Sequence, residues 1–432
     1  MAVWLVALMA ALSCGLRFWQ LARFNELVFD EVYFVSFARD YLAGLTPSDA
    51  HPPLGKYLIA LSIWMYEQLP LPASSVSYRW LNALVGSAIP LIVAGLAHTL
   101  GQRFGTQNPA RLHTFALLAG TFVAIDGLFV VESRYGLLNI YMVFFGLLGQ
   151  WLWLLQEKDS DFHLRMVAGV SLGCAVATKW NGLGFVLSLF IWELSRLGNQ
   201  KLIGEKISPL SSPLSSPLWR SKIVNLALSV LFISSITYVA AWVPHIARSQ
   251  ANLWDIHTSL FSFHQQLPAT GHSACSRWFS WPLLIKPISY WYETTSDIAY
   301  TVNNMGNPAL WWLSSAVVLL MLIDKVNDLS RKQQNYLTTY LLISYASNWL
   351  PWLLVSRCTF IYLYMPAATF SFVGLAWVMS GWLHARLVWM RWAGWAIAVI
   401  IASAFVFWLP LSMGAPLNID DLQLRWWLKS WI

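Results

Sequence analysis

The chain has 432 residues, of which 57% are hydrophobic and only 11% are charged. Soluble domains carry about 25% charged residues, so this composition excludes an ordinary soluble protein and indicates a polytopic membrane protein. The formal charge of +7 comes without a basic run interleaved with aromatic residues. It therefore argues against a nucleic-acid partner and fits basic cytoplasmic loops and a phosphate-binding site. The 27 tryptophans are typical of interfacial anchors and of grooves for amphipathic ligands.

Apolar stretches long enough to cross a bilayer, roughly 18–25 residues, recur along the chain. We expect about eleven spans near residues 3–20, 79–101, 112–131, 136–155, 165–178, 183–196, 222–244, 309–323, 337–355, 359–380 and 391–411. The apolar stretch 57–69 is too short to cross, so we expect a helix along the membrane surface. The predicted fold class is an all-α polytopic membrane protein with a single membrane domain over residues 1–432.

Lysine and arginine density sets the predicted orientation. These residues are denser in the shorter loops on the side of the N-terminus, which places the N-terminus in the cytoplasm. A first outer loop then covers 21–78, and a Ser/Pro/Leu-rich cytoplasmic linker covers 197–221. A second outer loop covers 245–308, and a tryptophan-rich outer tail at 413–432 is expected to lie at the interface as a short helix.

Spacing in the sequence predicts neither a disulfide nor a metal centre. The four cysteines are scattered, without a Cys-x-x-Cys or Cys/His pattern: Cys14, Cys174, Cys275 and Cys358. The second outer loop contains His245, His264 and His272, which together with the acidic pair described below could form a metal site, but their spacing shows no metal pattern. We therefore expect no metal and no cofactor.

Ionisable residues gather directly after the first predicted span. Asp30 and Glu31 begin a stretch that continues to Lys56. One interpretation is a helix start, where acidic residues suit the helix dipole. The functional interpretation is a general base, because activating a hydroxyl for attack on a sugar needs a carboxylate within hydrogen-bonding reach. Only one of two adjacent carboxylates takes the proton, so the other orients the substrate or holds a partner.

The string from His51 to Lys56 is the most specific in the chain. Its Pro-Pro pair stiffens the backbone and keeps His51 out of a helix. Gly55 permits a close approach of the backbone to a ligand, and Lys56 can reach a phosphate. The structural alternative is a loop that returns the chain to the membrane.

Four further cations stand at the ends of predicted spans on the same outer face: Arg79, Arg134, Lys179 and Arg357. A single cation at a membrane edge is most often an anchor whose charged end reaches water. Four cations facing the side of an acidic pair suit an anionic lipid headgroup and its leaving phosphate, which arginine can bind bidentately.

At these residues the sequence resembles the protein O-mannosyltransferase family. The similar strings, in chain order, are Phe29-Asp30-Glu31, His51 to Lys56, Tyr78-Arg79, Ser133-Arg134-Tyr135, Lys179 to Gly182, Trp281-Pro282-Leu283, Gly306-Asn307-Pro308 and Trp349 to Arg357. The resemblance implies a GT-C architecture with a large first outer loop, and Asp30 as catalytic base assisted by Glu31. It also implies that Arg79 and Arg357 hold the carrier phosphate or the acceptor. The absence of a large soluble insertion in 245–308 points to a bacterial form.

Two positions depart from the family pattern. Asn139 stands where the family usually has aspartate, and Leu363 stands where it typically has histidine. Both departures bear on the identity of the sugar or the acceptor more than on the class of reaction.

The expected protein is an inverting glycosyltransferase, multi-pass in the bacterial plasma (inner) membrane with its active site facing outside. It moves mannose from a polyprenyl-phosphate carrier to Ser/Thr hydroxyls of exported proteins. The expected partners are that carrier, the acceptor polypeptide and the bilayer. The expected catalytic residues are Asp30 and Glu31, and those binding carrier phosphate or substrate are His51, Lys56, Arg79, Arg134, Lys179 and Arg357.

Two alternatives stay open at this point. One is carrier-dependent transfer of another sugar to a lipid or glycan acceptor. The other is a transporter, which predicts ionisable residues near the middle of the membrane and an internal repeat. The charges instead lie mainly at the ends of spans, and no repeat is evident.

Overall fold

A computed structural model describes residues 3–156, 161–207, 223–268, 271–331 and 335–431. The helices are α1 (Val3–Phe18), α2 (Glu31–Leu42), α3 (Leu54–Glu67), α4 (Val76–Phe104), α5 (Pro109–Ala124), α6 (Gly127–Arg134), α7 (Asn139–Leu155), α8 (Phe162–Thr178), α9 (Leu183–Ile207), α11 (Ser234–Ser249), α12 (Leu253–Gln266), α13 (Pro308–Arg331), α14 (Tyr336–Trp349), α15 (Met365–Leu383), α16 (Val388–Met413) and α17 (Ile419–Gln423). Short 3-10 segments are η1 (Trp180–Gly182), η4 (Trp278–Leu283), η5 (Leu350–Leu354), η6 (Ile361–Tyr364) and η7 (Lys429–Trp431), and Ala227–Ile233 is a π-helical turn.

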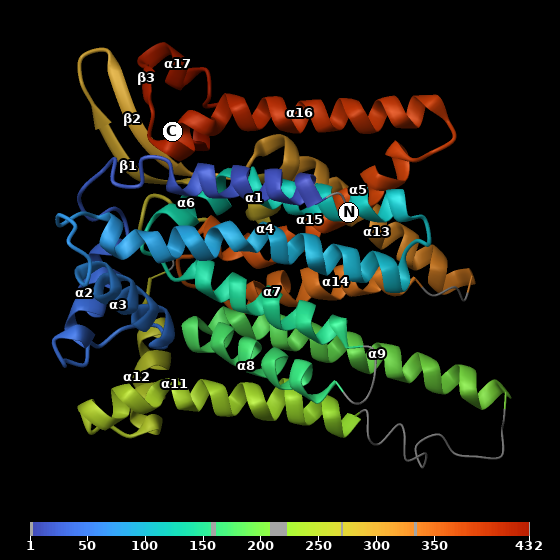
Figure 1. The fold of residues 1–432 in the computed structure, drawn as a ribbon, viewed down its shortest axis with the longest axis horizontal. Helices are drawn as coiled ribbons and strands as arrows, with labels where there is room; N and C mark the ends of the chain where they lie inside the picture. The colour runs from blue at the N-terminus through green and yellow to red at the C-terminus, as the bar shows by residue number, and fades with distance from the viewer. Residues whose placement is uncertain (1–2, 157–160, 208–222, 269–270, 332–334, 432) are drawn as a thin grey trace.

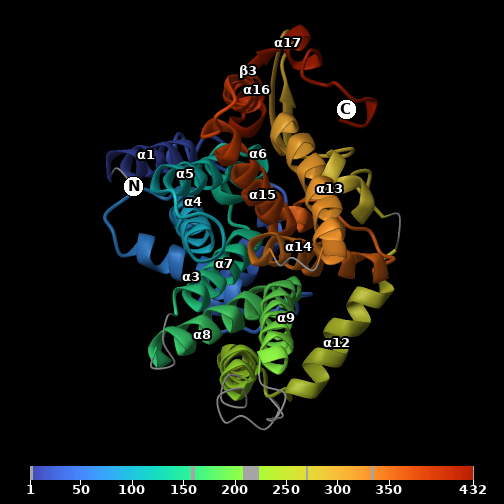
Figure 2. The same ribbon diagram turned by 90° about the vertical axis from the view of Figure 1, so that its right-hand side faces the viewer.

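The long helices run side by side as a bundle, and α2 and α3 lie together at one end of it (Figure 1). Helix α1 runs from the N-terminus toward that end, where the strands and the C-terminus also lie (Figure 1). Figure 2 looks along the bundle and shows α4, α5, α7 and α15 near its middle, with α16 on one side and α12 on the other. The prediction of a helical membrane protein is confirmed.

The predicted count of about eleven spans is not established. Among the described residues, five helices are long and apolar enough to cross a membrane: Val76–Phe104, Ile223–Ser249, Pro308–Asp328, Ile361–Leu383 and Val388–Met413. The pair α5 and α6 makes a sixth if it is taken as one span, but it bends by 57°. Helices α1, α7 and α8 are apolar and have 16, 17 and 17 residues, short of the usual ~20 for a span.

The bend interrupts the span predicted at 112–131, and Asp126 explains it. This buried residue is the N-cap of α6, where its side chain accepts a hydrogen bond from the Phe129 amide. The second carboxylate oxygen accepts from the Asn307 amide at 2.9 Å and from the Trp311 indole at 2.8 Å. A helix start inside the bundle is tolerated because these donors satisfy the carboxylate.

Close approach of the helices depends on glycine at two positions. A Cβ added to Gly86 of α4 would lie 2.4 Å from the Ser133 Cβ of α6. A Cβ added to Gly146 of α7 would lie 2.2 Å from the Phe185 ring of α9. Small residues allow helices in membranes to pack at such short range, and here they bring α6 and α9 against the middle of the bundle.

The sequence did not predict the small sheet. Strands β1 (Ile288–Thr294) and β2 (Ile298–Asn304) form an antiparallel hairpin, and β3 (Pro416–Asn418) pairs with β2. Aromatic and β-branched residues dominate ISYWYET and favour a strand. The tail after 413, expected as an interfacial helix, therefore supplies a strand before the short α17 and η7.

The structure also describes two other predicted segments, the second of them only in part. Helix α3 occupies the stretch expected for a short helix in the first outer loop. Helix α9 continues to Ile207, so the first half of the predicted linker 197–221 is helical, and the remainder, from residue 208, lies outside the described residues.

A buried ion pair fixes the chain between α1 and α2. Arg79 of α4 binds Glu31 at two points, Nε to Oε1 at 2.8 Å and Nη2 to Oε2 at 2.6 Å. Both side chains are inaccessible to solvent. The guanidinium also donates to three backbone carbonyls of the first loop, those of Leu21, Phe24 and Glu26. The carboxylate also accepts from the amides of Val28 and Gly136.

Removing one member of this pair should destabilise the fold. Breaking a buried ion pair from one side costs roughly 3–5 kcal/mol, because the other charge stays buried without its partner. Glu31→Ala and Arg79→Ala should therefore each lower the thermal unfolding midpoint of the purified protein strongly. In the double variant, the midpoint should fall by less than the sum of the two single decreases.

The neighbouring Asp30→Asn is the matched control, since Asp30 makes no side-chain capping bond to α2. Its midpoint should stay near that of the parent. Equal midpoints for Glu31→Ala and Asp30→Asn would contradict the structural role of Glu31.

Candidate active site

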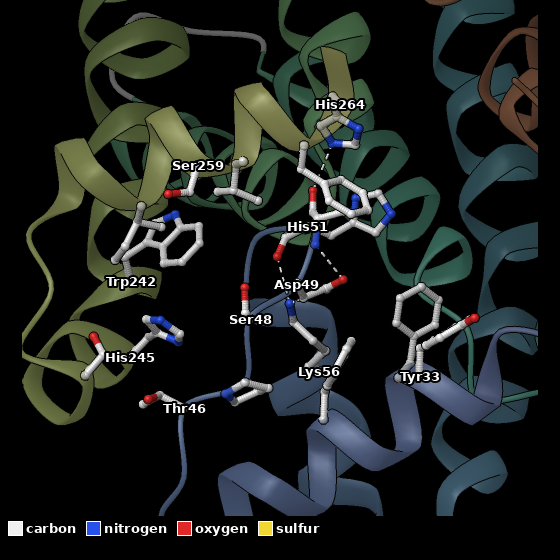
Figure 3. Close-up of a pocket in the computed structure, with 18 of the residues that line it drawn as sticks. Tyr33, Thr46, Ser48, Asp49, His51, Lys56, Trp242, His245, Ser259 and His264 are labelled. Atoms are coloured by element: carbon white, nitrogen blue, oxygen red, sulfur yellow. Dashed lines mark hydrogen bonds and ion pairs between the residues drawn. The ribbon is translucent and has the colours of Figure 1, made fainter. Parts of the chain in front are cut away.

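Asp30 lines a cavity of about 650 Å³, and Figure 3 shows other residues of its wall, among them Asp49, His51 and Lys56. The first loop, α2 and α3 form one wall, and α11 and α12 form the opposite wall (Figure 3). Among the sequence-predicted site residues, the cavity brings together Asp30, His51, Lys56 and Arg357. Trp242, His245 and His264 face them from α11 and α12.

An unusual backbone conformation sets the position of Asp30. Phe29 has a φ of +53°, in the left-handed region that non-glycine residues rarely adopt, and its ring stacks on Tyr290 of β1 at 4.0 Å between centroids. The chain then turns directly into α2. Among the described residues, no donor hydrogen bonds to the half-buried Asp30 carboxylate, so it is free to receive a proton from a ligand.

The surroundings of Asp30 suit a general base. Burial raises its pKa to about 6, with Lys179 opposing this shift and Asp49 adding to it. A base with a pKa just below neutral pH is mostly deprotonated there and still has useful affinity for a proton.

The string from His51 to Lys56 folds as a turn into α3. Lys56 is buried, and its Nζ lies 2.5 Å from Asp49 Oδ2 and donates to the His51 carbonyl at 2.7 Å. Burial lowers the pKa of Lys56, and the ion pair with Asp49 opposes the shift. Lys56 therefore shapes the cavity wall with its charge already matched by Asp49.

Two histidines lie where the turn meets α12. The His51 and His264 rings are 5.8 Å apart, and His264 Nε2 donates to the Ala50 carbonyl at 2.9 Å. Burial, together with the charges of Lys179 and Lys56, holds the pKa of His51 well below its usual range. His51 is therefore a neutral hydrogen-bonding group at neutral pH.

Lys179 follows α8 in an extended backbone conformation, and it is close enough to Asp30 for the two charges to influence each other's pKa. Its Nζ donates to Asn139 Oδ1 at 2.9 Å and lies 5.0 Å from the Tyr362 ring centroid. Burial lowers the pKa of Lys179 to about 8, while Asp30 and Glu132 raise it.

Asn139 connects this lysine to a carboxylate. Its amide nitrogen donates to Glu132 Oε2 at 3.1 Å. The other oxygen of Glu132 accepts from the Tyr290 hydroxyl at 2.5 Å and from Asn304 at 2.8 Å. The small sheet therefore buttresses the site through Glu132.

A second cavity, of about 1030 Å³, meets the first at three residues: His51, His264 and Arg357. Lys179 also lines it. Most of its remaining wall is apolar and comes from α9, η5 and the following residues, including Val186, Leu187, Phe190, Trp352, Leu354 and Val355. The pair of cavities thus offers an apolar groove that ends at cations, with the Asp30 carboxylate beyond them.

Arg357 lies next to a disulfide that the sequence did not predict. Cys275 and Cys358 are joined, although 83 positions separate them in sequence. Connectivity between distant cysteines cannot be read from spacing. The half-buried Arg357 donates from Nη1 to the Cys358 carbonyl at 3.1 Å, the hydrogen bond described for this guanidinium.

Three of the predicted site residues lie behind the cavities rather than in them. Glu31 and Arg79 hold each other, as described above, and line neither cavity. Arg134 is also absent from both walls. Its Nη1 donates to the backbone carbonyls at the end of α1, those of Leu16, Arg17 and Trp19. Through these contacts, the three residues hold the first loop in position.

Sequence reasoning missed several residues of the site. The sequence spacing pointed to His264 only as a possible metal ligand and gave no role to Glu132. Trp242 and Tyr362 carry no local sequence signal, because folding alone brings them to the site. Within the described ranges, no three His, Cys, Asp or Glu side chains are grouped to hold a metal ion.

Comparisons with known proteins agree along the length of the chain. Residues 7–247 match the family model described as dolichyl-phosphate-mannose-protein mannosyltransferase. Residues 249–431 match the model of the C-terminal four-helix transmembrane region of protein O-mannosyltransferase.

Two bacterial relatives are called polyprenol-phosphate-mannose–protein mannosyltransferase. The one from Corynebacterium glutamicum is 24% identical over 367 residues, which cover 70% of this chain and 65% of the relative. The one from Mycolicibacterium smegmatis is 22% identical, and the match covers 99% of this chain and 92% of the relative.

Solved structures show the same fold. The protein O-mannosyltransferase Pmt1-Pmt2 complex of S. cerevisiae, bound to the sugar donor, matches with a TM-score of 0.84 at 15% identity, covering 100% of this chain and 93% of that chain. ArnT from Cupriavidus metallidurans, bound to undecaprenyl phosphate, matches with a TM-score of 0.54 at 14% identity, covering 96% and 76%. The expected GT-C-like fold is confirmed.

The consecutive family matches, from residue 7 to residue 431, agree with the motifs, the multi-pass helical fold and the structural likeness. The chain belongs to the dolichyl-phosphate-mannose-protein mannosyltransferase family.

Proposed function

We propose that this protein transfers mannose from a polyprenyl-phosphate carrier to Ser or Thr hydroxyls of exported polypeptides, with inversion at the anomeric carbon. The observation that carries the proposal is the meeting of two cavities at Arg357, His51 and His264, one apolar and the other containing Asp30. The names of the bacterial relatives and the donor-bound yeast structure support the donor and the acceptor class.

The apolar cavity suits the carrier lipid. Its wall of α9 and η5 side chains would contact the polyprenyl chain, and Arg357 and Lys179 would contact the phosphate. A guanidinium can bind two phosphate oxygens at once, whereas an ammonium acts as a point charge. This arrangement would place the sugar between the phosphate and the Asp30 cavity.

The reaction follows from that placement. Asp30 takes the proton of the acceptor hydroxyl as its oxygen attacks the anomeric carbon. The new carbon–oxygen bond forms while the bond from the anomeric carbon to the phosphate oxygen breaks, through an oxocarbenium-like transition state. The carrier phosphate leaves with the bonding electrons, and Arg357 and Lys179 stabilise its charge. Because these cations supply that charge stabilisation, we propose no metal or other cofactor.

We further propose that the site faces the outside of a bacterial plasma membrane, with the N-terminus in the cytoplasm. The disulfide beside Arg357 supports this orientation, because disulfides persist in oxidising compartments outside the cytoplasm. Glu31, Arg79 and Arg134 then act by holding the first outer loop, and Lys56 acts by shaping the turn that carries His51.

A second candidate is transfer of another carrier-linked sugar to a lipid or glycan. The structural likeness to ArnT bound to undecaprenyl phosphate favours it, as do Asn139 and Leu363, which depart from the family pattern near Lys179 and Tyr362. Membranes supplied with radiolabelled lipid-linked sugar separate the two candidates, since label enters protein in one case and lipid or glycan in the other.

Substitution of the proposed base tests the reaction. Asp30→Asn should reduce mannose transfer to a Ser/Thr peptide by about a hundredfold or more, because general-base catalysis contributes about 10²–10⁴-fold. Radiolabelled polyprenyl-phosphate mannose and the purified protein provide the assay. Asp40→Asn, on the same helix but outside the cavity, should transfer normally. Normal transfer by a folded Asp30→Asn protein would refute the proposal.

The pH dependence of transfer tests the two shifted groups. Asp30 must be deprotonated to act as base, so activity should rise through its pKa of about 6. Lys179 must be protonated to stabilise the phosphate, so activity should fall through its pKa of about 8. The profile of kcat/KM should therefore be bell-shaped.

Lys179→Arg provides the control for the alkaline limb. An arginine stays charged throughout this range, so the alkaline fall should disappear in a variant that retains activity. A parent profile that stays flat from about pH 5 to about pH 9 would contradict both assignments.

A further inference from the structure

The disulfide between Cys275 and Cys358 adjoins the wall that separates the two cavities. Cys358 directly follows Arg357, which lines both cavities. Its partner, Cys275, lies between α12, which carries His264, and the 3-10 segment η4. The bond therefore links the two chain segments that contribute His264 and Arg357 to the shared wall.

Hydrogen bonds continue this connection. The Cys358 amide donates to the Pro268 carbonyl at 3.0 Å, just after α12. The Ser276 amide donates to the Thr359 carbonyl at 2.8 Å, and Thr359 Oγ1 donates to the Ser276 carbonyl at 2.6 Å. Ser276 in turn accepts from the fully buried Trp281 indole at 2.9 Å. The cross-linked segment is thus anchored in the core on the side of Cys275.

Apart from the disulfide and these hydrogen bonds at Cys358 and Thr359, the segment that carries Arg357 has little support. It lies between η5 and η6 without helical hydrogen bonds. Leu353 and Leu354, shortly before it, are 63% and 87% exposed. The one hydrogen bond described for the Arg357 guanidinium goes to the carbonyl of Cys358 itself. The position of this charge therefore depends on where Cys358 is held.

We propose that the Cys275–Cys358 disulfide positions Arg357 for the carrier phosphate, so that tight binding of a polyprenyl phosphate requires the oxidised protein. This inference rests on the proposed function for the identity of the ligand. Forming the bond removes two electrons and two protons from the two thiols, and a disulfide-containing oxidant outside the cytoplasm accepts them as it becomes two thiols.

A positioning role and a purely structural role predict different kinetics. Arg357 meets the donor phosphate, whereas α2, α3 and α11 contribute much of the Asp30 cavity without this cross-link. Loss of the bond should therefore raise the KM for the donor, and because Arg357 also stabilises the charge of the leaving phosphate, it should lower kcat as well. A structural role would lower the folded fraction without changing the KM of the molecules that remain folded.

The experiment uses the full-length protein in lipid nanodiscs. Cys275→Ser, Cys358→Ser and the double variant should each raise the donor KM and the Kd for undecaprenyl phosphate by about tenfold or more, the effect of weakening one charge-assisted hydrogen bond. The double variant should show the same KM and Kd as each single variant. Cys14→Ser and Cys174→Ser, which remove the free cysteines, are the controls and should bind normally.

Reduction of the parent protein covers the case in which these variants do not fold. Dithiothreitol should weaken binding of undecaprenyl phosphate to the level expected for the variants, and oxidised glutathione should restore it. Mass spectrometry of the untreated protein should find Cys275 joined to Cys358. Free thiols at these positions, or an unchanged Kd after complete reduction, would overturn the proposal.

The lipid-binding readout separates this inference from the proposed function. If oxidised protein binds undecaprenyl phosphate more tightly than reduced protein but transfers no mannose, the positioning role stands and the proposed mannosyl transfer fails. If mannose transfer proceeds equally in oxidised and reduced protein, the proposed function stands and the positioning role fails.

Discussion

The buried pair of Glu31 and Arg79 is the interaction on which the site depends. Ionised side chains are costly to bury, so each must be matched by a partner and by hydrogen bonds. Arg79 meets this need with Glu31 and with carbonyls of the first loop, and Glu31 meets it with Arg79 and two backbone amides. The adjacent Asp30 is then held at the cavity wall by its neighbour. Two consecutive acidic residues thus have separate tasks: one is neutralised inside the bundle, and the other faces the ligand.

The same division of roles recurs among the cations. Arg134 resembles Arg79 in donating hydrogen bonds from its guanidinium to backbone carbonyls, here those at the end of α1 and just after it, and Lys56 is matched by Asp49. Arg357 and Lys179 instead line the apolar cavity, near the place where it meets Asp30. Cationic residues that look alike in the sequence therefore have two different roles. Some hold the chain in place through buried partners, and others are positioned to bind an anion.

Much of this organisation was predictable from the sequence, and the reasons differ by feature. The first loop was found because its acids and the proline-stiffened string at His51 contrast with apolar surroundings. The helices were found because bilayer thickness demands long apolar runs. The break at Asp126 was missed because its satisfying donors, Asn307 and Trp311, are distant in sequence. The sheet was missed because a seven-residue aromatic strand looks like part of an interfacial segment. His264 and the disulfide depend on pairings that only the fold creates.

Asn139 has a consequence for how the product leaves. Its neutral amide lies between the Lys179 ammonium and the Glu132 carboxylate, where an aspartate would add a further negative charge. In the proposed reaction, the donor is a phosphodiester with one negative charge, and the spent carrier is a phosphomonoester with nearly two at neutral pH. The electrostatic attraction between the site and its lipid therefore increases once the sugar has gone. In the proposed reaction, a site with asparagine here would therefore hold the spent carrier more tightly than a site with aspartate, because it carries one carboxylate fewer.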